Sequence, residues 1–411
     1  MFLNYLWVAF ILVAFFVALA DLLLTGSGTV FGAMTDALFE QAKTGFELSI
    51  GLAGILTLWQ GLLNVGDKSG LVRRFARLTA PFFGVLFPSI PKGHPVMGTM
   101  LMNFSANLLG LDNAATPLGL QTMQDLQKLN ARKEEASDAM IMFLCINASG
   151  LTLIPITIIM YRLQMGSAAP SDVFLPILLA TGASTLAAIL MVAFKQKINL
   201  LRLPFLLPMF VLMALVALGF WGIRSISQEQ LTAISTSVSH VVLLGMVALL
   251  VGSGLLARRN VYEDFIEGAK EGFGTAVKII PYLVAILVAV GVFRASGALD
   301  WITKGISYMA GVLGGMDTSW VDALPTMVMK PLSGSGARGL MIEAMQNYGP
   351  DSFVGRLVCL VQGSSDTTFY IISLYYGSVA IKKIRYTLGI SLLADLVGMI
   401  ASVSLCYFFY F

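Results

Sequence analysis

Two polar segments that break helices interrupt a chain that is otherwise apolar. Residues 103–117 contain three asparagines, an aspartate and a proline, and residues 330–339 contain a lysine, an arginine and a Ser-Gly-Ser-Gly run. The two segments occupy similar places in the two halves of the chain. Lipid cannot hydrogen-bond exposed backbone groups, so interrupted helices persist at membrane depth only where they line a cavity or pack within protein. Broken segments at corresponding places in two halves point to the binding site of a transporter.

The composition excludes several classes of protein. Of the 411 residues, 57% are hydrophobic and 12% are charged, which is typical of a membrane protein and not of a soluble globular one. The net charge of +3 comes without a dense basic run, so no nucleic-acid partner is expected. The chain has only two histidines, too few for a histidine-rich metal cage. Its three cysteines lie in apolar surroundings, which argues against a disulfide framework. It has no P-loop, which argues against a nucleotide-hydrolysing motor. No nucleophile elbow or zinc-binding HExxH helix is present, so we expect no catalytic residues, no metal and no cofactor.

Nine apolar runs reach the length of about 20 residues that a membrane-crossing helix needs. They are 2–24, 46–65, 138–161, 172–194, 203–224, 232–256, 276–296, 353–378 and 386–410. The first is expected to be a retained membrane helix and not a cleaved signal peptide, because it lacks a basic leading segment. Two further stretches, 82–129 and 306–347, are apolar but cut by prolines and glycines. We expect each to be a re-entrant hairpin that enters and leaves the membrane on the same side.

Lysine and arginine indicate the orientation in the membrane. They cluster at 68–77, 128–133, 195–202, 258–259 and 382–385. With nine crossings and two hairpins, all five clusters fall on one side, which should be the cytoplasm. The sequence therefore predicts a multi-pass protein of the bacterial inner membrane with a cytoplasmic N-terminus and an external C-terminus. Two amphipathic stretches, 67–77 and 262–278, are expected either as helices along the membrane surface or as solvated connectors.

The same order of elements occurs twice. A spanning helix precedes an interrupted hairpin, and a spanning helix with a polar start follows it. The paired segments are 46–65 with 276–296 for the first helix, and 145–152 with 359–368 for the polar start. Because an odd number of crossings separates the two first helices, the second repeat should begin on the opposite face. The predicted fold is an all-α integral membrane protein with two inverted repeats, 1–200 and 201–411, each with a re-entrant hairpin and a broken transmembrane helix.

Polar side chains at the hairpins and in the broken helices are the candidate ligands, because such groups and freed carbonyls can coordinate a cation or bind a solute. The candidate substrate-binding residues are Asn103, Asn107, Asp112, Asn113, Asn147, Ser149, Lys330, Ser333, Ser335, Arg338, Gln362, Ser364 and Ser365, and the candidate ion-coupling residues are Asp366, Thr152, Thr367 and Thr368. Small polar residues also mediate helix packing in membranes, which is the stronger interpretation for Ser149 alone. Helix capping is at least an equal alternative for Asp112 and Asn113.

Three of these residues carry a charge. A carboxylate within an apolar span is costly, so Asp366 is expected to bind a cation, carry a proton or neutralise Lys330 or Arg338. The alternative for Asp366 is a purely structural ion pair. Lys330 and Arg338 flank a glycine-rich turn whose N–H groups and following helix N-terminus favour an anion. The alternatives are that Lys330 extends to the membrane interface and that Arg338 pairs with Glu343.

Several motifs resemble those of known families. Residues 103–130 (NFSANLLGLDNAATPLGLQTMQDLQKLN) resemble the spore maturation A family. The stretches EGAKEGF (267–273), IIPYLVA (279–285), GVFRASGA (291–298) and KPLSGSGARG (330–339) resemble the spore maturation B family. The resemblance covers most of the chain and implies a fusion of the two, joined near residues 194–203. Each half resembles the nucleoside-recognition, or gate, domain, which is also similar to parts of concentrative nucleoside transporters. The resemblance implies re-entrant hairpins beside broken helices, and it supplies no catalytic residue.

These observations predict a secondary transporter for a small solute. The positive charges of Lys330 and Arg338 favour an anionic solute. Coupling to Na⁺ or H⁺ is expected, since the chain has no ATPase module. One alternative is a non-transporting membrane scaffold or accessory factor in cell-envelope or spore maturation, and a less favoured one is a membrane enzyme acting on lipid precursors. The expected partners are membrane lipid and the solute, and formation of a homo-oligomer is left open.

Overall fold

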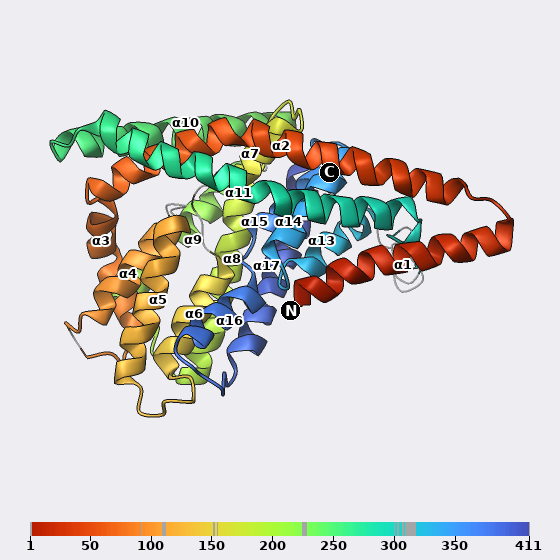
Figure 1. Cartoon of the computed structure of the whole chain (residues 1–411). Helices are drawn as coiled ribbons and strands as arrows, with labels where there is room; N and C mark the ends of the chain where they lie inside the picture. Colours follow the sequence, from red (N-terminus) through yellow and green to blue (C-terminus); the bar gives the residue numbers. More distant parts are fainter. Residues whose placement is uncertain are drawn as a thin grey trace. The chain divides into compact units, whose positions relative to one another are not determined.

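The fold is helical throughout the part of the chain that the structure describes. This part of the computed structural model comprises residues 2–91, 93–108, 112–150, 153, 155–223, 228–299, 301, 304–305, 308 and 318–410. Its regular elements are α-helices and one 3₁₀ turn, with no strand among the described residues (Figure 1). The predicted all-α class is therefore confirmed for this part.

The chain forms two compact units, and each unit draws on both halves of the sequence. Unit 1 comprises Met1–Gly61, Thr157–Pro170 and Ala269–Gln362, and unit 2 comprises Leu62–Ile156, Ser171–Gly268 and Gly363–Phe411. The units are thus not the sequence repeats 1–200 and 201–411, and the division into repeats stays a prediction. Two long helices, α2 (Thr29–Lys68) and α11 (Val261–Ala295), each contribute residues to both units.

Unit 1 is built around the N-terminal helix and the apolar end of α11. Besides parts of α2 and α11, its helices are α1 (Phe2–Thr25), α7 (Ile156–Gln164), the 3₁₀ turn η1 (Val321–Ala323), α13 (Leu324–Met329), α14 (Gly334–Tyr348) and α15 (Phe353–Gly363). Ala14 of α1 packs with Met34 of α2 and Phe293 of α11 in a buried cluster. The indole N–H of Trp7 donates to the carbonyl of Ala285 at 2.9 Å, which fixes α1 against α11.

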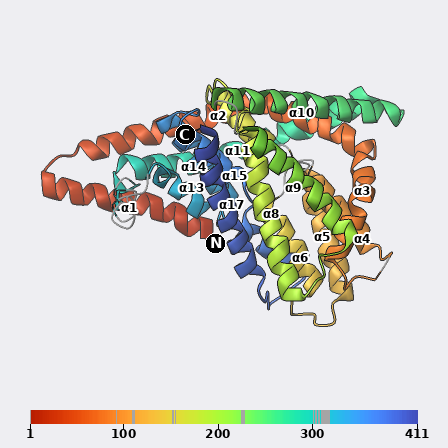
Figure 2. The same cartoon turned by 180° about the vertical axis from the view of Figure 1, so that it is seen from behind.

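Unit 2 surrounds a helix that is buried on every side. Its helices are α3 (Leu71–Leu86), α4 (Val96–Leu108), α5 (Asp112–Leu129), α6 (Asp138–Ser149), α8 (Phe174–Gln196), α9 (Leu203–Ile223), α10 (Gln228–Leu256), α16 (Thr368–Ser378) and α17 (Thr387–Tyr410). Residues Ala139–Ser149 of α6 are all buried. The helices α8 and α17 lie side by side in both views (Figures 1 and 2). Polar side chains on α6 therefore face protein and not lipid.

The ends of α6 follow from its sequence. The Ser137 hydroxyl accepts the N–H of Met140 at 3.3 Å, and Asp138 adds a negative charge in the first turn, as favourable helix starts do. At the other end Gly150 takes a left-handed conformation (φ 63°), and its N–H donates to the Asn147 carbonyl. Such a glycine terminates a helix at low cost, so the sequence itself stops α6 after twelve residues.

Seven helices are long and apolar enough to cross a membrane, counted over the described residues. They are Trp7–Thr25, Thr29–Lys68, Phe174–Gln196, Thr236–Leu256, Val261–Ala295, Phe353–Ser378 (which includes a break) and Thr387–Tyr410. Each overlaps one of the nine predicted spans, and the chain is a multi-pass membrane protein. The predicted span 203–224 matches α9, which has 21 residues.

Three predicted boundaries were wrong. The helix expected at 46–65 begins at Thr29 and has 40 residues. The stretch 262–278 is neither a separate surface helix nor a connector, because it is continuous with the apolar part of α11. The polar residues 145–149, expected at the start of a span, close the helix α6, and the predicted span 138–161 is divided into α6 and α7. The glycine end of α6 is the physical reason for this division.

Two pairs of short helices occupy the places of the predicted hairpins. The helices α4 and α5 pack together, as do α13 and α14. With 13, 6 and 15 residues, α4, α13 and α14 are shorter than the roughly 20 residues of a complete crossing. Residues 109–111 at the first tip lie outside the described part. The re-entrant course of both pairs stays a prediction.

In each unit, an arginine–aspartate ion pair joins two segments that are far apart in the sequence. In unit 1, the fully buried Arg162 at the end of α7 contacts Asp351, which precedes α15, with Nη2–Oδ1 at 2.8 Å. In unit 2, Arg385 follows α16 and contacts Asp138, the first residue of α6, with Nη1–Oδ1 at 2.7 Å. Each pair joins the end of one broken helix to the beginning of the other within a single unit. The outer ends of the two broken helices, away from the breaks, are thereby held in place.

Candidate functional site

The breaks of the two interrupted helices meet in unit 2. The backbone N–H of Asp366 donates to the carbonyl of Ala148 at 2.8 Å. A Cβ atom built on Gly150 would lie 2.6 Å from the Asp366 nitrogen and 2.9 Å from the Ser365 carbonyl carbon. Only glycine permits so close an approach of two backbones. Helix ends that meet in this way carry backbone N–H and C=O groups without helical partners, which can bind ions or solutes.

Asparagines of α4 face α6 near this contact. The Asn107 Nδ2 donates to Oδ1 of Asn147 at 2.8 Å, and Asn147 Nδ2 donates to the Phe143 carbonyl at 2.9 Å. Asn103 is completely buried and donates to the Ala115 carbonyl of α5 at 2.7 Å. Its Oδ1 atom is buried and accepts no hydrogen bond from any described residue. The structure thus brings three of the predicted site residues together around the N-terminal side of the break.

Hydroxyl groups cover the opposite side of the α6 end. Ser149 Oγ lies within hydrogen-bond distance of the Ile146 carbonyl, at 2.8 Å, and of Thr185 Oγ1 of α8, at 3.0 Å. Thr181 Oγ1 donates to the Gly150 carbonyl at 3.0 Å, so one of the carbonyls freed by the helix end is satisfied from α8. The Ser149 hydroxyl therefore holds α6 to α8, as the packing interpretation of this residue predicts.

The second break supplies a run of buried hydroxyls and one exposed carboxylate. Ser364, Ser365, Thr367 and Thr368 are all buried, whereas Asp366 is exposed. The Asp366 carboxylate accepts the N–H of Thr367 at 2.6 Å. The buried Ser365 Oγ makes no hydrogen bond with a described residue. Buried polar atoms without a protein partner are rare in native proteins, which makes this oxygen a candidate ligand atom.

A carboxylate that the sequence analysis missed lies beside this run. Asp395 of α17 is 1% exposed, and its Oδ2 accepts the Thr368 hydroxyl at 2.7 Å. Ser184 of α8 donates to the neighbouring Ala394 carbonyl at 3.0 Å. A Cβ on Gly398 would lie 3.2 Å from the Ser364 carbonyl oxygen, so α17 approaches the break closely. Asp395 lies within the predicted span 386–410, and a carboxylate in an apolar span was the signal that could have revealed it.

The charged candidates of the second hairpin belong to unit 1. Lys330 is 4% exposed, which argues against its extension to a membrane interface. Ser333 is the N-cap of α14: its hydroxyl accepts the N–H of Gly336 at 3.0 Å and lies 3.3 Å from the hydroxyl of Ser335. The guanidinium carbon of Arg338 lies 6.0 Å from the centre of the Tyr161 ring, within range of a cation–π contact.

Glu343, offered as a partner of Arg338, forms an ion pair with Arg294 of α11. The Arg294 Nη2 lies 3.0 Å from Oε2 of Glu343, and Asn347 Nδ2 donates to Oε1 at 2.7 Å. The Tyr348 ring lies 5.4 Å from the Arg294 guanidinium carbon. Glu343 has 2% of its side chain exposed. This buried pair joins α11 to α14, and Arg294 was not among the predicted functional residues.

The structure describes the surroundings of the remaining candidates only in part. Gln362 is buried at the end of α15, and its Oε1 makes no hydrogen bond with a described residue. Thr152 lies outside the described residues. Asp112 and Asn113 begin α5, but their side chains are not described. The substrate-binding and ion-coupling roles of these residues stay predictions.

The loop carboxylate of unit 1 has a shifted acidity. Burial by itself raises the pKa of Asp351, but four interactions outweigh it and lower the pKa below its usual range. These interactions are hydrogen bonds from the Ser167 hydroxyl and the Ala168 N–H and the positive charges of Arg162 and Arg356. Asp351 is therefore an ionised carboxylate that holds the α7–α8 loop to the start of α15.

Comparison with known proteins places this arrangement in a family. The family model described as "Nucleoside recognition" (Gate) matches residues 49–164 and 276–382, together more than half of the chain. Spore maturation protein A of Bacillus subtilis (strain 168) is 41% identical over 187 residues, which cover 46% of this chain and 92% of that protein. Spore maturation protein B of the same organism is 42% identical over 164 residues, 39% of this chain and 90% of that protein.

No solved structure matches the chain significantly. Each relative is covered over about nine-tenths of its length by less than half of this chain, as expected for a fusion of the two. The two matched segments of the family model contain the first broken helix and the second one. The chain belongs to the nucleoside-recognition (Gate) family and is homologous to spore maturation proteins A and B.

Proposed function

We propose that this protein is a secondary transporter of a small solute, coupled to Na⁺ or H⁺. The observation that carries the proposal is the contact between Asp366 and Ala148, where two interrupted helices meet at their breaks inside a multi-pass membrane protein. Discontinuous helices whose ends face one another are a recurrent way for transporters to bind ions and substrates. A scaffold needs no such break, and lipid would make it costly.

The buried carboxylate is the centre of the proposed cation site. Asp395 is surrounded by hydroxyl-bearing segments, and its bond to Thr368 fixes one oxygen toward the N-terminal turn of α16. Carboxylate, hydroxyl and carbonyl oxygens are suitable ligands for Na⁺, and a carboxylate alone can carry a proton. Asp366, the predicted coupling residue, is exposed and is proposed to attract the cation toward this place.

Unit 1 supplies the groups proposed for an anionic part of the solute. Lys330 and Arg338 flank the N-terminus of α14, whose backbone N–H groups add positive partial charge. The hydroxyl of Ser335 is partly exposed beside them. Because the family description names nucleosides, nucleosides and nucleotides head the compounds to be tested, followed by carboxylates and inorganic phosphate.

The proposed setting is the bacterial cytoplasmic membrane, with the N-terminus inside and the C-terminus outside. The paired contacts Arg162–Asp351 and Arg385–Asp138 support inverted repeats, because they join equivalent positions of the two sequence repeats. In each, the end of one broken helix contacts the start of the other. Cysteine labelling in sealed vesicles would test the orientation, and labelling of a C-terminal cysteine from the cytoplasmic side alone would contradict it.

The decisive experiment compares cation and solute responses of the purified protein. Melting would be recorded in Na⁺ and in choline at pH 6 and pH 8, followed by uptake into proteoliposomes under a Na⁺ or pH gradient. A cation at 100 times its Kd should stabilise the protein by about 2.7 kcal/mol. Asp395→Asn should abolish the cation response, whereas Asp125→Asn, which removes a carboxylate paired with Lys128 at the surface, should preserve it.

A second candidate is an accessory factor in spore maturation, which the names of both relatives favour. Such a factor would show the same fold but no response to any cation or solute, and Asp395→Asn would leave its in vivo role intact. A wild-type protein that melts identically in all conditions and takes up none of the compounds would favour this candidate over the transporter.

A further inference from the structure

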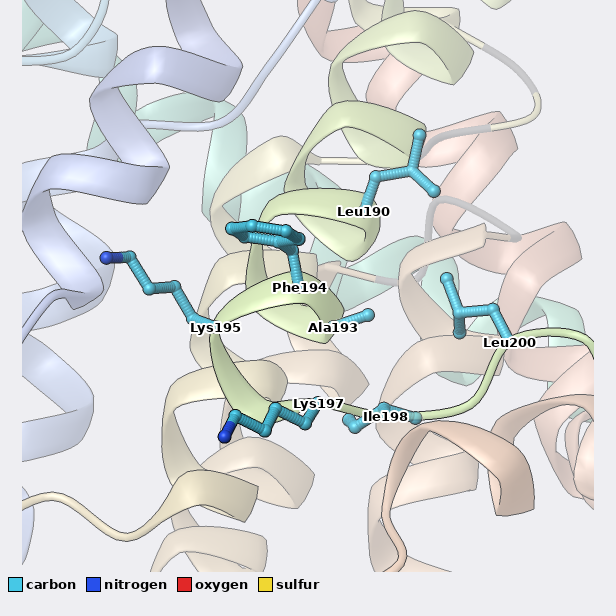
Figure 3. Close-up of a pocket in the computed structure, with 7 residues that line it drawn as sticks. All are labelled: Leu190, Ala193, Phe194, Lys195, Lys197, Ile198 and Leu200. Carbon is cyan, nitrogen blue, oxygen red and sulfur yellow. The ribbon is translucent and has the colours of Figure 1, made fainter.

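A surface pocket lies at the C-terminal end of α8, apart from the breaks. It is lined by Leu190, Ala193, Phe194, Lys195, Lys197, Ile198 and Leu200 (Figure 3). Lys195 is ten residues beyond Thr185, which contacts Ser149, and ten residues of helix extend over about 15 Å. The pocket is therefore a feature distinct from the buried polar groups around Asp395.

The way α8 ends creates the pocket. Lys197 takes a left-handed conformation (φ 55°), and its N–H donates to the carbonyls of Ala193 and Phe194. The chain consequently turns back, and the N–H of Ile198 also donates to Ala193. This turn places Ile198 and Leu200 beside Leu190 and Ala193 (Figure 3), so that apolar side chains from the helix and from the following segment form one wall.

The rest of the pocket combines an exposed aromatic ring with two cations. Phe194 is 84% exposed and Leu190 is 48% exposed. Lys195 and Lys197 are exposed, and neither forms an ion pair with a described residue. Figure 3 shows both lysine side chains extending to the same side of the helix end. Since α8 is long enough to cross the bilayer, its end lies at the level where apolar lipid gives way to headgroups.

We propose that this pocket binds one anionic phospholipid. The phosphate contacts the ammonium groups of Lys195 and Lys197, and an acyl chain lies along Leu190 and Phe194. Long lysine side chains reach from an apolar surface to a charged headgroup, and basic residues just outside a membrane helix attract anionic lipids. The apolar wall disfavours a free anion, and the two uncompensated cations disfavour a zwitterionic lipid. The proposal does not depend on transport.

Lipid binding to the detergent-purified full chain tests the proposal. Native mass spectrometry would compare phosphatidylglycerol with phosphatidylcholine of the same acyl chains. Each lysine should contribute about fivefold to the affinity for the anionic lipid. The double variant Lys195→Gln/Lys197→Gln should therefore weaken phosphatidylglycerol binding by roughly 25-fold. The control Lys43→Gln/Lys382→Gln removes the same charge from two exposed surface pairs and should leave binding unchanged.

A third variant separates a lipid from a soluble anion. Phe194→Ser should weaken phosphatidylglycerol binding while both lysines remain, and inorganic phosphate at millimolar concentration should not displace the lipid. Equal affinities for the two lipids, or equal losses in the lysine variant and its control, would overturn the proposal. Displacement by phosphate with no effect of Phe194→Ser would identify a soluble-anion site and refute the lipid.

Discussion

The N–H of Asp366 and the carbonyl of Ala148 form a hydrogen bond of 2.8 Å between residues that are 218 positions apart in sequence. The bond joins the turn before α16 to the last turn of α6. It requires a residue without a side chain at Gly150, because a Cβ there would lie 2.6 Å from the Asp366 nitrogen. The contact therefore depends on a single position, which makes it open to a direct test.

Gly150→Ala should destabilise the protein by more than the roughly 1 kcal/mol that a left-handed alanine costs, since the new methyl group also displaces the Asp366 backbone. The measurement is the melting temperature of the purified protein. Gly182→Ala in α8 is the control, because a Cβ there meets no atom within 4 Å and alanine favours a helix. A Gly150→Ala protein that melts like wild type would show that the two breaks do not meet.

Thr368→Val should lower the free energy of unfolding by about 1.5–3 kcal/mol, the usual contribution of a hydrogen bond to a charged group. Valine keeps the shape of threonine but leaves Asp395 Oδ2 without the hydroxyl that now lies 2.7 Å away. Thr368→Ser retains the hydroxyl and should recover most of the loss. If serine and valine have the same effect, the shape of the side chain and not its hydrogen bond is what matters.

Replacing Arg294 by Gln should destabilise the protein by about 3–5 kcal/mol, because the Glu343 carboxylate would remain buried without its cation. The double variant Arg294→Gln/Glu343→Gln should be more stable than Arg294→Gln alone. Chemical unfolding of the three proteins in detergent would measure these differences. A double variant no more stable than the single one would show that the two charges are not coupled.

Acid should weaken the loop contact of unit 1. The pKa of Asp351 is lowered in the folded protein, so its contribution to stability is complete above the unfolded value of about 3.9 and is lost as pH falls through the lower folded value. The difference in melting temperature between wild type and Asp351→Asn should be constant from pH 7 to about pH 5 and shrink below pH 4.

Glu134→Gln is the control for this titration, because it removes a carboxylate from an exposed pair with Lys382. It should leave the melting temperature almost unchanged at every pH, as surface pairs contribute little. A wild-type minus Asp351→Asn difference that grows as the pH falls would contradict the lowered pKa.

A chain divided between residues 200 and 201 should regain its structure only when both fragments are produced together. Each compact unit contains segments from both sides of this cut. Fragment 1–200 alone lacks α17, against which α8 packs, and fragment 201–411 alone lacks α6. Co-purification of the two fragments in a folded complex would agree with this expectation. A single fragment with the full melting transition of unit 2 would contradict it.

Hydropathy was sufficient to predict most of the membrane helices, because long apolar runs have few alternatives in a bilayer. It failed for α2, whose first part carries Asp36, Glu40 and Lys43 and therefore did not count as apolar. It also separated residues 262–278 from α11, because charge along a helix changes hydropathy without ending the helix. Helix continuity depends on backbone hydrogen bonds, which hydropathy does not report.

The sequence was sufficient to predict many of the polar residues of the candidate site, but not the contacts between them. Gly150 and the run Ser364–Thr368 were visible as helix-breaking sequence. The pairing of Asn107 with Asn147 depends on tertiary packing, which one sequence does not encode in any local pattern. Asp395 was overlooked although its signal was local, since the surrounding span is so apolar that the carboxylate should have stood out.

The interleaving of the two units also governs the order in which they can form during synthesis. The helix α8 packs against α17, the last helix of the chain. At about 5–20 residues per second, α8 leaves the ribosome on the order of 10 s or more before its partner. During that interval Ser184 of α8 lacks its acceptor, the Ala394 carbonyl of α17. The nascent protein must therefore hold α8 in the membrane with its α17-facing side uncovered until translation ends, so the membrane-insertion machinery is engaged for longer than by a chain of sequentially folding domains.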